Sequence, residues 1–119
     1  MSIVVDFTTG QPKQRESVWC QFDGTIASLT NNVVIDTLPL NEFDRMKYEI
    51  SFKGTTQDDV RSLSMNVQQL DGSIKEQVYG RLGPMKISLD TNINGASFEL
   101  LASNPENFDV NFCLTVLTT

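Results

Sequence analysis

The stretch Lys47-Tyr-Glu-Ile-Ser-Phe-Lys53 alternates apolar and polar residues without interruption. Alternation places Tyr48, Ile50 and Phe52 on one face of an extended chain and the charged and hydroxyl side chains on the other. A period of two residues is typical of a half-buried β-strand. The same alternation returns at three later places: 63–67, 87–93 and 110–116.

Turn signals divide the rest of the chain into short strands. Asp71-Gly72 and Asn94-Gly95 predict tight hairpins, the latter of type I′, and Asp23-Gly24 is expected to close an earlier strand. Residues 41–46 are the only helical candidate, and they span barely one turn. The expected strands are 3–7, 17–22, 25–28, 33–35, 47–53, 60–70, 73–82, 85–93, 96–102 and 108–118. This pattern predicts a single all-β domain over residues 1–119. We expect an antiparallel β-sandwich, jelly-roll-like or Ig-like, with eight to ten strands and little or no helix.

The charge of the chain argues against two classes of partner. The 119 residues carry a net charge of −6, with 39% hydrophobic and 20% charged residues. An acidic chain gains nothing from counterion release on nucleic acid, and anionic membrane surfaces repel it. No apolar run reaches the ~20 residues of a membrane-spanning helix. The first residues lack the basic segment of a secretory signal, which predicts synthesis in the host cytoplasm.

Histidine is absent from the chain, which removes most catalytic designs. Histidine general acid–base chemistry, the Ser-His-Asp and Cys-His arrangements and nearly every catalytic zinc site depend on it. No phosphate-binding loop or dinucleotide fingerprint is present either. We therefore expect no enzyme, no catalytic residue, no cofactor and no metal. Asp58-Asp59 is the one adjacent acidic pair, and a solvated loop is favoured there over a weak calcium site.

Two cysteines, Cys20 and Cys113, are far apart in the sequence. If residues 17–22 form a strand, Cys20 shares a face with Val18 and Phe22, whereas Cys113 lies on the face opposite Phe112 and Leu114. Sulfur atoms on different sides cannot bond. The alternation therefore predicts two buried free thiols.

Trp19 and Gln21 are the candidate contact residues. Trp19 is out of phase with Val18, Cys20 and Phe22, so it shares a face with Gln21 and points away from theirs. Exposed on a sandwich surface, the pair would contact a protein partner or a glycan. The favoured alternative is that this strand lies between sheets or under a loop, with Trp19 buried in the core.

The polar faces of the expected strands carry few charges. They are rich in serine, asparagine, glutamine and threonine, whereas soluble surfaces usually carry more lysine and glutamate. Neutral side chains suit contacts between subunits, because buried charge is costly and amides are readily paired. These faces predict assembly with other protein chains.

The chain as a whole resembles the small all-β structural proteins of tailed-bacteriophage virions, of the tail collar, baseplate accessory or head-decoration type. The strings that carry the resemblance are Phe22-Asp-Gly-Thr-Ile26, Val78-Tyr-Gly-Arg-Leu82 and Asn92-Ile-Asn-Gly-Ala96. The resemblance implies a non-enzymatic virion component, of the tail or tail tip, that packs as repeated copies in a ring or lattice against a larger virion protein. It assigns no functional residue. A glycan-binding module and a capsid decoration protein are the alternatives.

Overall fold

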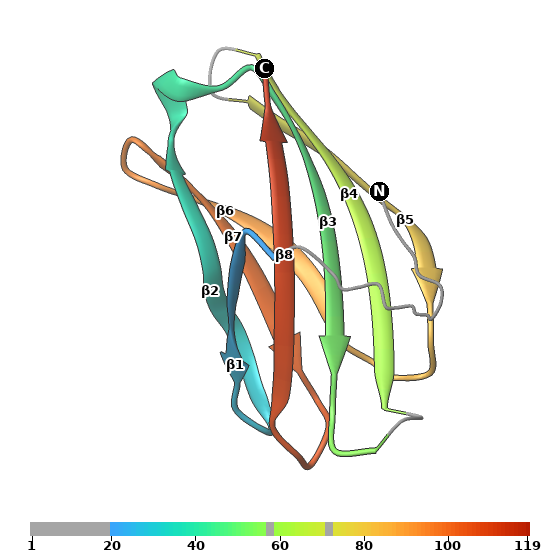
Figure 1. Cartoon of the computed structure of the whole chain (residues 1–119). Coiled ribbons are helices and arrows are strands. Elements are labelled where there is room, and N and C mark those ends of the chain that lie inside the picture. Colours follow the sequence, from blue (N-terminus) through green and yellow to red (C-terminus); the bar gives the residue numbers. More distant parts are fainter. Residues whose placement is uncertain (1–19, 57–58, 71–72) are drawn as a thin grey trace, which may run out of the picture.

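A computed structural model describes residues 20–56, 59–70 and 73–119, which form two antiparallel β-sheets packed against each other (Figure 1). The larger sheet has the strand order β1-β8-β3-β4-β5 and the smaller one β2-β7-β6. The strands are β1 (Phe22–Ile26), β2 (Thr30–Pro39), β3 (Arg45–Lys53), β4 (Val60–Leu70), β5 (Ser73–Leu82), β6 (Ser88–Asn94), β7 (Ser97–Asn104) and β8 (Val110–Thr118). A 3₁₀ turn, η1 (Leu40–Glu42), joins β2 to β3, and the described residues contain no α-helix. The predicted all-β sandwich is confirmed.

Most of the expected strands after residue 45 are found close to their predicted places. β4 and β5 have the predicted bounds, and β3 begins two residues earlier than expected. The expected strand at 85–93 begins only at Ser88, although Met85 and Ile87 are buried. The expected strand 3–7 and the turn Asp71-Gly72 lie outside the described residues.

The turn predicted at Asp23-Gly24 is wrong, because both residues lie inside β1. They pair with Cys113 and Phe112 of β8. A Cβ atom on Gly24 would lie 2.9 Å from ring carbons of Phe112. The absence of a side chain at Gly24 therefore leaves room for the Phe112 ring. The sequence alone does not distinguish a glycine with this role from a glycine in a turn. Of the strand expected at 25–28, residues 25–26 belong to β1 and residues 27–28 lie in the turn after it, whereas the strand expected at 33–35 is part of the longer β2.

The Asn94-Gly95 hairpin is confirmed, with a different turn. Asn94 pairs with Ser97, so the two-residue loop is Gly95-Ala96. Gly95 has φ +63°, and Ala96 is not among the positive-φ residues. A type I′ turn needs positive φ at both loop residues, whereas glycine alone at the first position fits type II′.

The core lies between the two sheets and contains the predicted alternating residues. Tyr48, Ile50 and Phe52 of β3 are at most 3% exposed. From the opposite sheet, Phe98 and Leu100 of β7 are fully buried. The alternation of β7 is complete, with every second side chain buried from Phe98 onward. Period-two alternation therefore decided which face of each strand is buried.

One polar contact joins the two sheets through the core. The Tyr48 hydroxyl donates a hydrogen bond to Asp36 Oδ2 of β2 at 2.7 Å. A bulge in β2 makes this possible, since the register shifts between Val34 and Asp36 and sets Asp36 opposite the buried Leu100. Burial raises the pKa of Asp36, and the hydrogen bonds from Tyr48 and the Thr37 backbone partly offset that effect. Burial of the Tyr48 hydroxyl, and secondly its hydrogen bond to the Asp36 carboxylate, raise the pKa of Tyr48 well above its ordinary value.

We expect Asp36 to make the domain more stable in mild acid. Its folded-state pKa is above the ordinary value of 3.8, so the stability it contributes is complete below that value. That stability is lost as the pH rises through the folded-state pKa. Asp36→Asn keeps an acceptor for Tyr48 and should remove this loss. Tyr48→Phe should instead cost about 1–3 kcal/mol at neutral pH, by leaving the carboxylate without its donor. Urea unfolding between pH 4 and 8 measures both, and an unchanged pH dependence in Asp36→Asn would contradict the assignment.

Asn104 is the one buried polar residue found among the described residues, and it is fully hydrogen-bonded. Its Nδ2 donates to the carbonyl oxygens of Ile26 (3.3 Å), Ala27 (3.2 Å) and Phe108 (3.0 Å). Its Oδ1 accepts from the Glu106 backbone N–H at 3.0 Å. Asn104 therefore fastens the β1–β2 turn to the β7–β8 loop.

Candidate interaction surface

The outward side of the larger sheet is a broad polar surface, here called the polar face. The strand pairing sets neutral hydrogen-bonding residues beside one another across β8, β3, β4 and β5. Its neutral polar members are Ser51, Ser62, Ser64, Asn66, Gln68, Gln77, Asn111 and Thr115. The weakly charged strand faces predicted for β4 and β8 thus lie on one surface, with the charged residues Arg45, Lys47, Glu49 and Lys53 of β3 between them.

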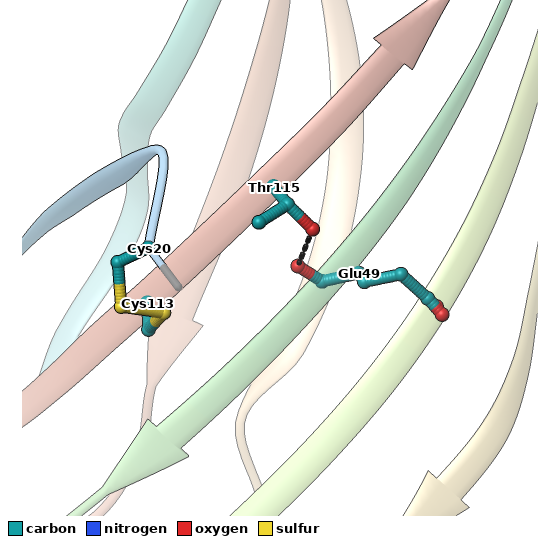
Figure 2. The surroundings of a disulfide bond; sticks show 4 residues. All are labelled: Cys20, Glu49, Cys113 and Thr115. Carbon is teal, nitrogen blue, oxygen red and sulfur yellow. Dashed lines mark hydrogen bonds between the residues drawn. A yellow bond between two sulfur atoms is a disulfide. The ribbon is translucent and has the colours of Figure 1, made fainter. Parts of the chain in front are cut away.

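Hydrogen bonds order the middle of the polar face. The Ser64 hydroxyl lies 2.6 Å from both carboxylate oxygens of Glu49. On the other side, the Thr115 hydroxyl donates to the Glu49 backbone carbonyl at 3.4 Å (Figure 2). Side chains held in one conformation lose less entropy when a partner binds.

A disulfide bond joins Cys20 to Cys113 on this face (Figure 2), so the prediction of free buried thiols is wrong. The two Cα atoms are 5.4 Å apart, within the usual range for a disulfide. Cys113 does point opposite to Leu114, as expected. The error concerns Cys20, which precedes β1 and lies on no strand, so alternation does not set the direction of its side chain. The bond links residues 93 positions apart.

A basic hollow occupies the end of the polar face nearest the C-terminus. It encloses about 670 Å³. The outward side chains that line it are Arg45, Lys47, Asn66, Gln68, Lys75, Gln77 and Leu117, and all are exposed. Glu76 and the C-terminal residue Thr119 also line the hollow, so its three cations outnumber its one acidic side chain. Together with three amides and a leucine that is 72% exposed, the cations form a surface suited to an anionic partner.

A second hollow of about 670 Å³ lies beside the disulfide. Its polar lining comes from Asp23, Thr25, Ser51, Lys53, Ser62 and Asn111. The Thr25 hydroxyl donates to Asn111 Oδ1 at 2.8 Å, which ties β1 to β8 here. Arg61 also lines this hollow, so its hydroxyl and amide groups lie beside one acid and two cations.

Of the two predicted contact residues, the structure describes only Gln21. Its side chain is exposed, and its Oε1 accepts a hydrogen bond from the Val116 backbone N–H at 2.9 Å. That amide lies on β8 beyond the last residue paired with β1, so the Gln21 side chain continues the strand pairing. Trp19 lies outside the described residues, and the role of the pair stays a prediction.

Asp59 has a local structural role in the β3–β4 loop. Its Oδ2 accepts hydrogen bonds from the Thr55 hydroxyl (3.2 Å), the Thr56 hydroxyl (3.0 Å) and the Thr56 backbone N–H (3.0 Å). Desolvation raises the pKa of Asp59, but the hydrogen bonds from Thr55 and Thr56 together outweigh it and lower the pKa below its ordinary value. Asp58 is not described. Across residues 20–56, 59–70 and 73–119, no group of three acidic, cysteine or histidine residues could hold a metal ion.

The outward side of the smaller sheet is here called the acidic face. The acids on it are Asp90 and Glu99, and β2, β6 and β7 contain no lysine or arginine. The Asn92 and Asn94 amides donate to Glu99 at 3.0 and 3.2 Å and lower its pKa. Beside the acids, Val34 pairs with Leu101 and is 47% exposed.

Comparisons with known proteins are sparse. No protein-family model matches the sequence, and no curated protein is similar to it at a significant level. The tailspike protein of Acinetobacter baumannii phage AM24 is similar in structure over 82% of this chain, with 12% identity and a TM-score of 0.42. The tailspike protein of Acinetobacter phage vB_ApiP_P1 is similar over 98% of it, with 10% identity and a TM-score of 0.42. The chain spans about 25% of either tailspike, and likeness at this level carries no functional argument.

The described residues contain no helix long and apolar enough to cross a membrane.

Proposed function

We propose that this protein is a non-enzymatic structural component of a tailed-phage virion, a tail or tail-tip accessory subunit that packs as repeated copies against a larger tail protein. The observation that carries the proposal is the polar face, a wide and ordered surface on which neutral hydrogen-bonding residues lie beside the charged residues of β3 and β5. Neutral amides and hydroxyls can be paired with a partner chain at little desolvation cost, unlike the charges of an ordinary soluble surface.

The disulfide supports a location in the finished particle. Disulfide bonds persist in oxidising surroundings such as virion surfaces and are rare in proteins kept in the cytosol. A virion protein made in the host cytoplasm would form the Cys20–Cys113 bond once the particle reaches the medium. The described residues also offer neither a metal cluster nor a histidine for catalysis.

Mass spectrometry of purified particles of the phage that encodes this chain tests the proposal. We expect the protein in the particles at a copy number that is a multiple of the tail symmetry. Immunogold labelling should then mark the tail rather than the capsid. Capsid labelling would favour a decoration protein, and absence from washed particles would remove the structural role altogether.

A glycan-binding module is the second candidate, and the two hollows on the polar face favour it. Both are lined by amide or hydroxyl groups, which can donate hydrogen bonds to saccharide hydroxyls and accept them. Binding on a glycan array that Asn111→Ala or Gln77→Ala abolishes would support this function. An array without any signal would leave the structural role as the sole candidate.

A further inference from the structure

The two sheets differ in their charge: cations outnumber the acids Asp23, Glu49 and Glu76 on the larger sheet, and the smaller sheet has no cation. Of the Lys and Arg residues in the described chain, all but Lys86 lie on strands of the larger sheet. The charged residues of the smaller sheet are all acids. The basic hollow and the acidic face therefore point away from each other, on opposite sides of the sandwich.

We propose that copies of this protein stack head to tail, with the acidic face of one copy seated on the basic hollow of the next. The inference rests on the proposed function, because it takes the repeated copy as the partner and names the surfaces in contact. Asp90 and Glu99 meet Arg45, Lys47 and Lys75, and the exposed Leu117 meets Val34 and Leu101. Complementary charge fixes the register of such a contact and opposes other pairings.

The hydrogen bonds on the acidic face prepare it for this contact. Two amides hold the Glu99 carboxylate in place, so little side-chain entropy is lost when a cation approaches. Asp90 and Leu101 are directly paired across β6 and β7, which places an acid beside an apolar residue. On the opposite side of the sandwich, Lys47 is paired with Leu117 across β3 and β8. Each face thus sets a charge next to an apolar side chain, with the opposite sign on the two faces.

The contact is heterologous, because it joins two different surfaces. Heterologous contacts repeat into a closed ring or an open filament, and they do not stop at a dimer. The contact is also small. Three strands spaced ~4.8 Å apart and about eight residues long give a footprint of roughly 350 Å², below the ~800 Å² per partner of a standard interface. Stacking should therefore be weak in free solution and become strong where a larger protein gathers the copies.

Reciprocal charge reversal tests the stacking. The first variant carries Lys47→Glu and Lys75→Glu, and the second carries Asp90→Lys and Glu99→Lys. Alone, each has two faces of like charge, and we expect self-association at least tenfold weaker than that of the unmodified protein. Mixed in equal amounts, the two variants should associate again, because each reversed face then meets a complementary one. Arg81→Glu and Glu42→Lys, single reversals off both faces, should leave association within about twofold of the original.

Sedimentation equilibrium at up to about 1 mM protein measures the extent of this association as the average mass of the particles in solution. The mass of the unmodified protein should rise with concentration at about 20 mM salt and fall at 0.5 M, where charges are screened within ~4 Å. Carbodiimide should cross-link Lys47 or Lys75 to Asp90 or Glu99, which lie on opposite sides of one copy and so can be joined only between copies. Urea unfolding of each variant shows that it remains folded.

Three results would overturn the stacking. They are a monomeric unmodified protein under all conditions, failure of the mixture to associate, and association of the second variant to the same extent as the original. The last result would indicate a contact between two basic hollows through an outside anion, such as an acidic glycan or a partner protein. None of these outcomes bears on the proposed location, because the presence of the protein in purified particles is measured separately.

Discussion

Asn104→Asp is expected to destabilise the domain by about 4 kcal/mol or more at neutral pH. The substitution replaces an N–H donor by a carboxylate oxygen that faces the carbonyl oxygens of Ile26, Ala27 and Phe108. Those carbonyls lose their donor, and an ionised group with no cation beside it is buried in its place. An unsatisfied buried polar group costs about 1–3 kcal/mol, and a buried charge costs more.

The pH dependence identifies the cause. Burial raises the pKa of the introduced carboxyl above its ordinary value, so its protonated form, which can donate one hydrogen bond, is favoured when folded. Stability should therefore return as the pH falls toward 4 and be lost as it rises through the raised pKa. Urea midpoints at pH 4.5 and 7.5 measure this. Asn104→Ala is the control, since it should lose about 2–4 kcal/mol at both pH values. Equal losses for Asn104→Asp at the two pH values would contradict this account.

Removing the Cys20–Cys113 bond is the second large effect, with an expected loss of about 2–4 kcal/mol. The bond spans 93 residues, and a loop of that length strongly restricts the unfolded chain. For a domain of this size the loss corresponds to a fall in Tm of roughly 10–15 °C. Cys20→Ser, Cys113→Ser and the double variant should show nearly the same fall, because either single change abolishes the bond.

Thermal unfolding with and without dithiothreitol measures this effect. Reductant should lower the Tm of the original protein to that of the double variant and leave the double variant unchanged. A thiol assay on denatured protein isolated without reductant should find no free sulfhydryl. Two titratable thiols in that assay would show that the bond does not form, and the free-thiol prediction from the sequence would stand.

Alternation was a reliable guide where strands are long and one face is buried. β3, β4 and β7 follow it residue by residue, because a slip by one position would expose the whole apolar set. It failed where the chain leaves the strand pattern. Cys20 precedes β1, Gly24 makes room for an aromatic ring, and the bulge in β2 turns Asp36 inward. Each of these three features depends on a neighbour far away in the sequence. For the same reason, no sequence pattern around Asn104 predicts its buried hydrogen bonds.

The alternating residues from Lys47 onward determined by themselves that this protein is an antiparallel sandwich whose strands have one apolar and one polar face. The alternation within each strand is enough to predict this fold class, because each strand buries its apolar side chains on one face. Only the tertiary structure decided which strands are neighbours. That pairing gathers the neutral side chains into the polar face, brings Cys20 to Cys113 and collects Arg45, Lys47 and Lys75 in one hollow. It also leaves Asp90 and Glu99 on the opposite side. Such groupings arise from long-range strand pairing, which no stretch of sequence contains.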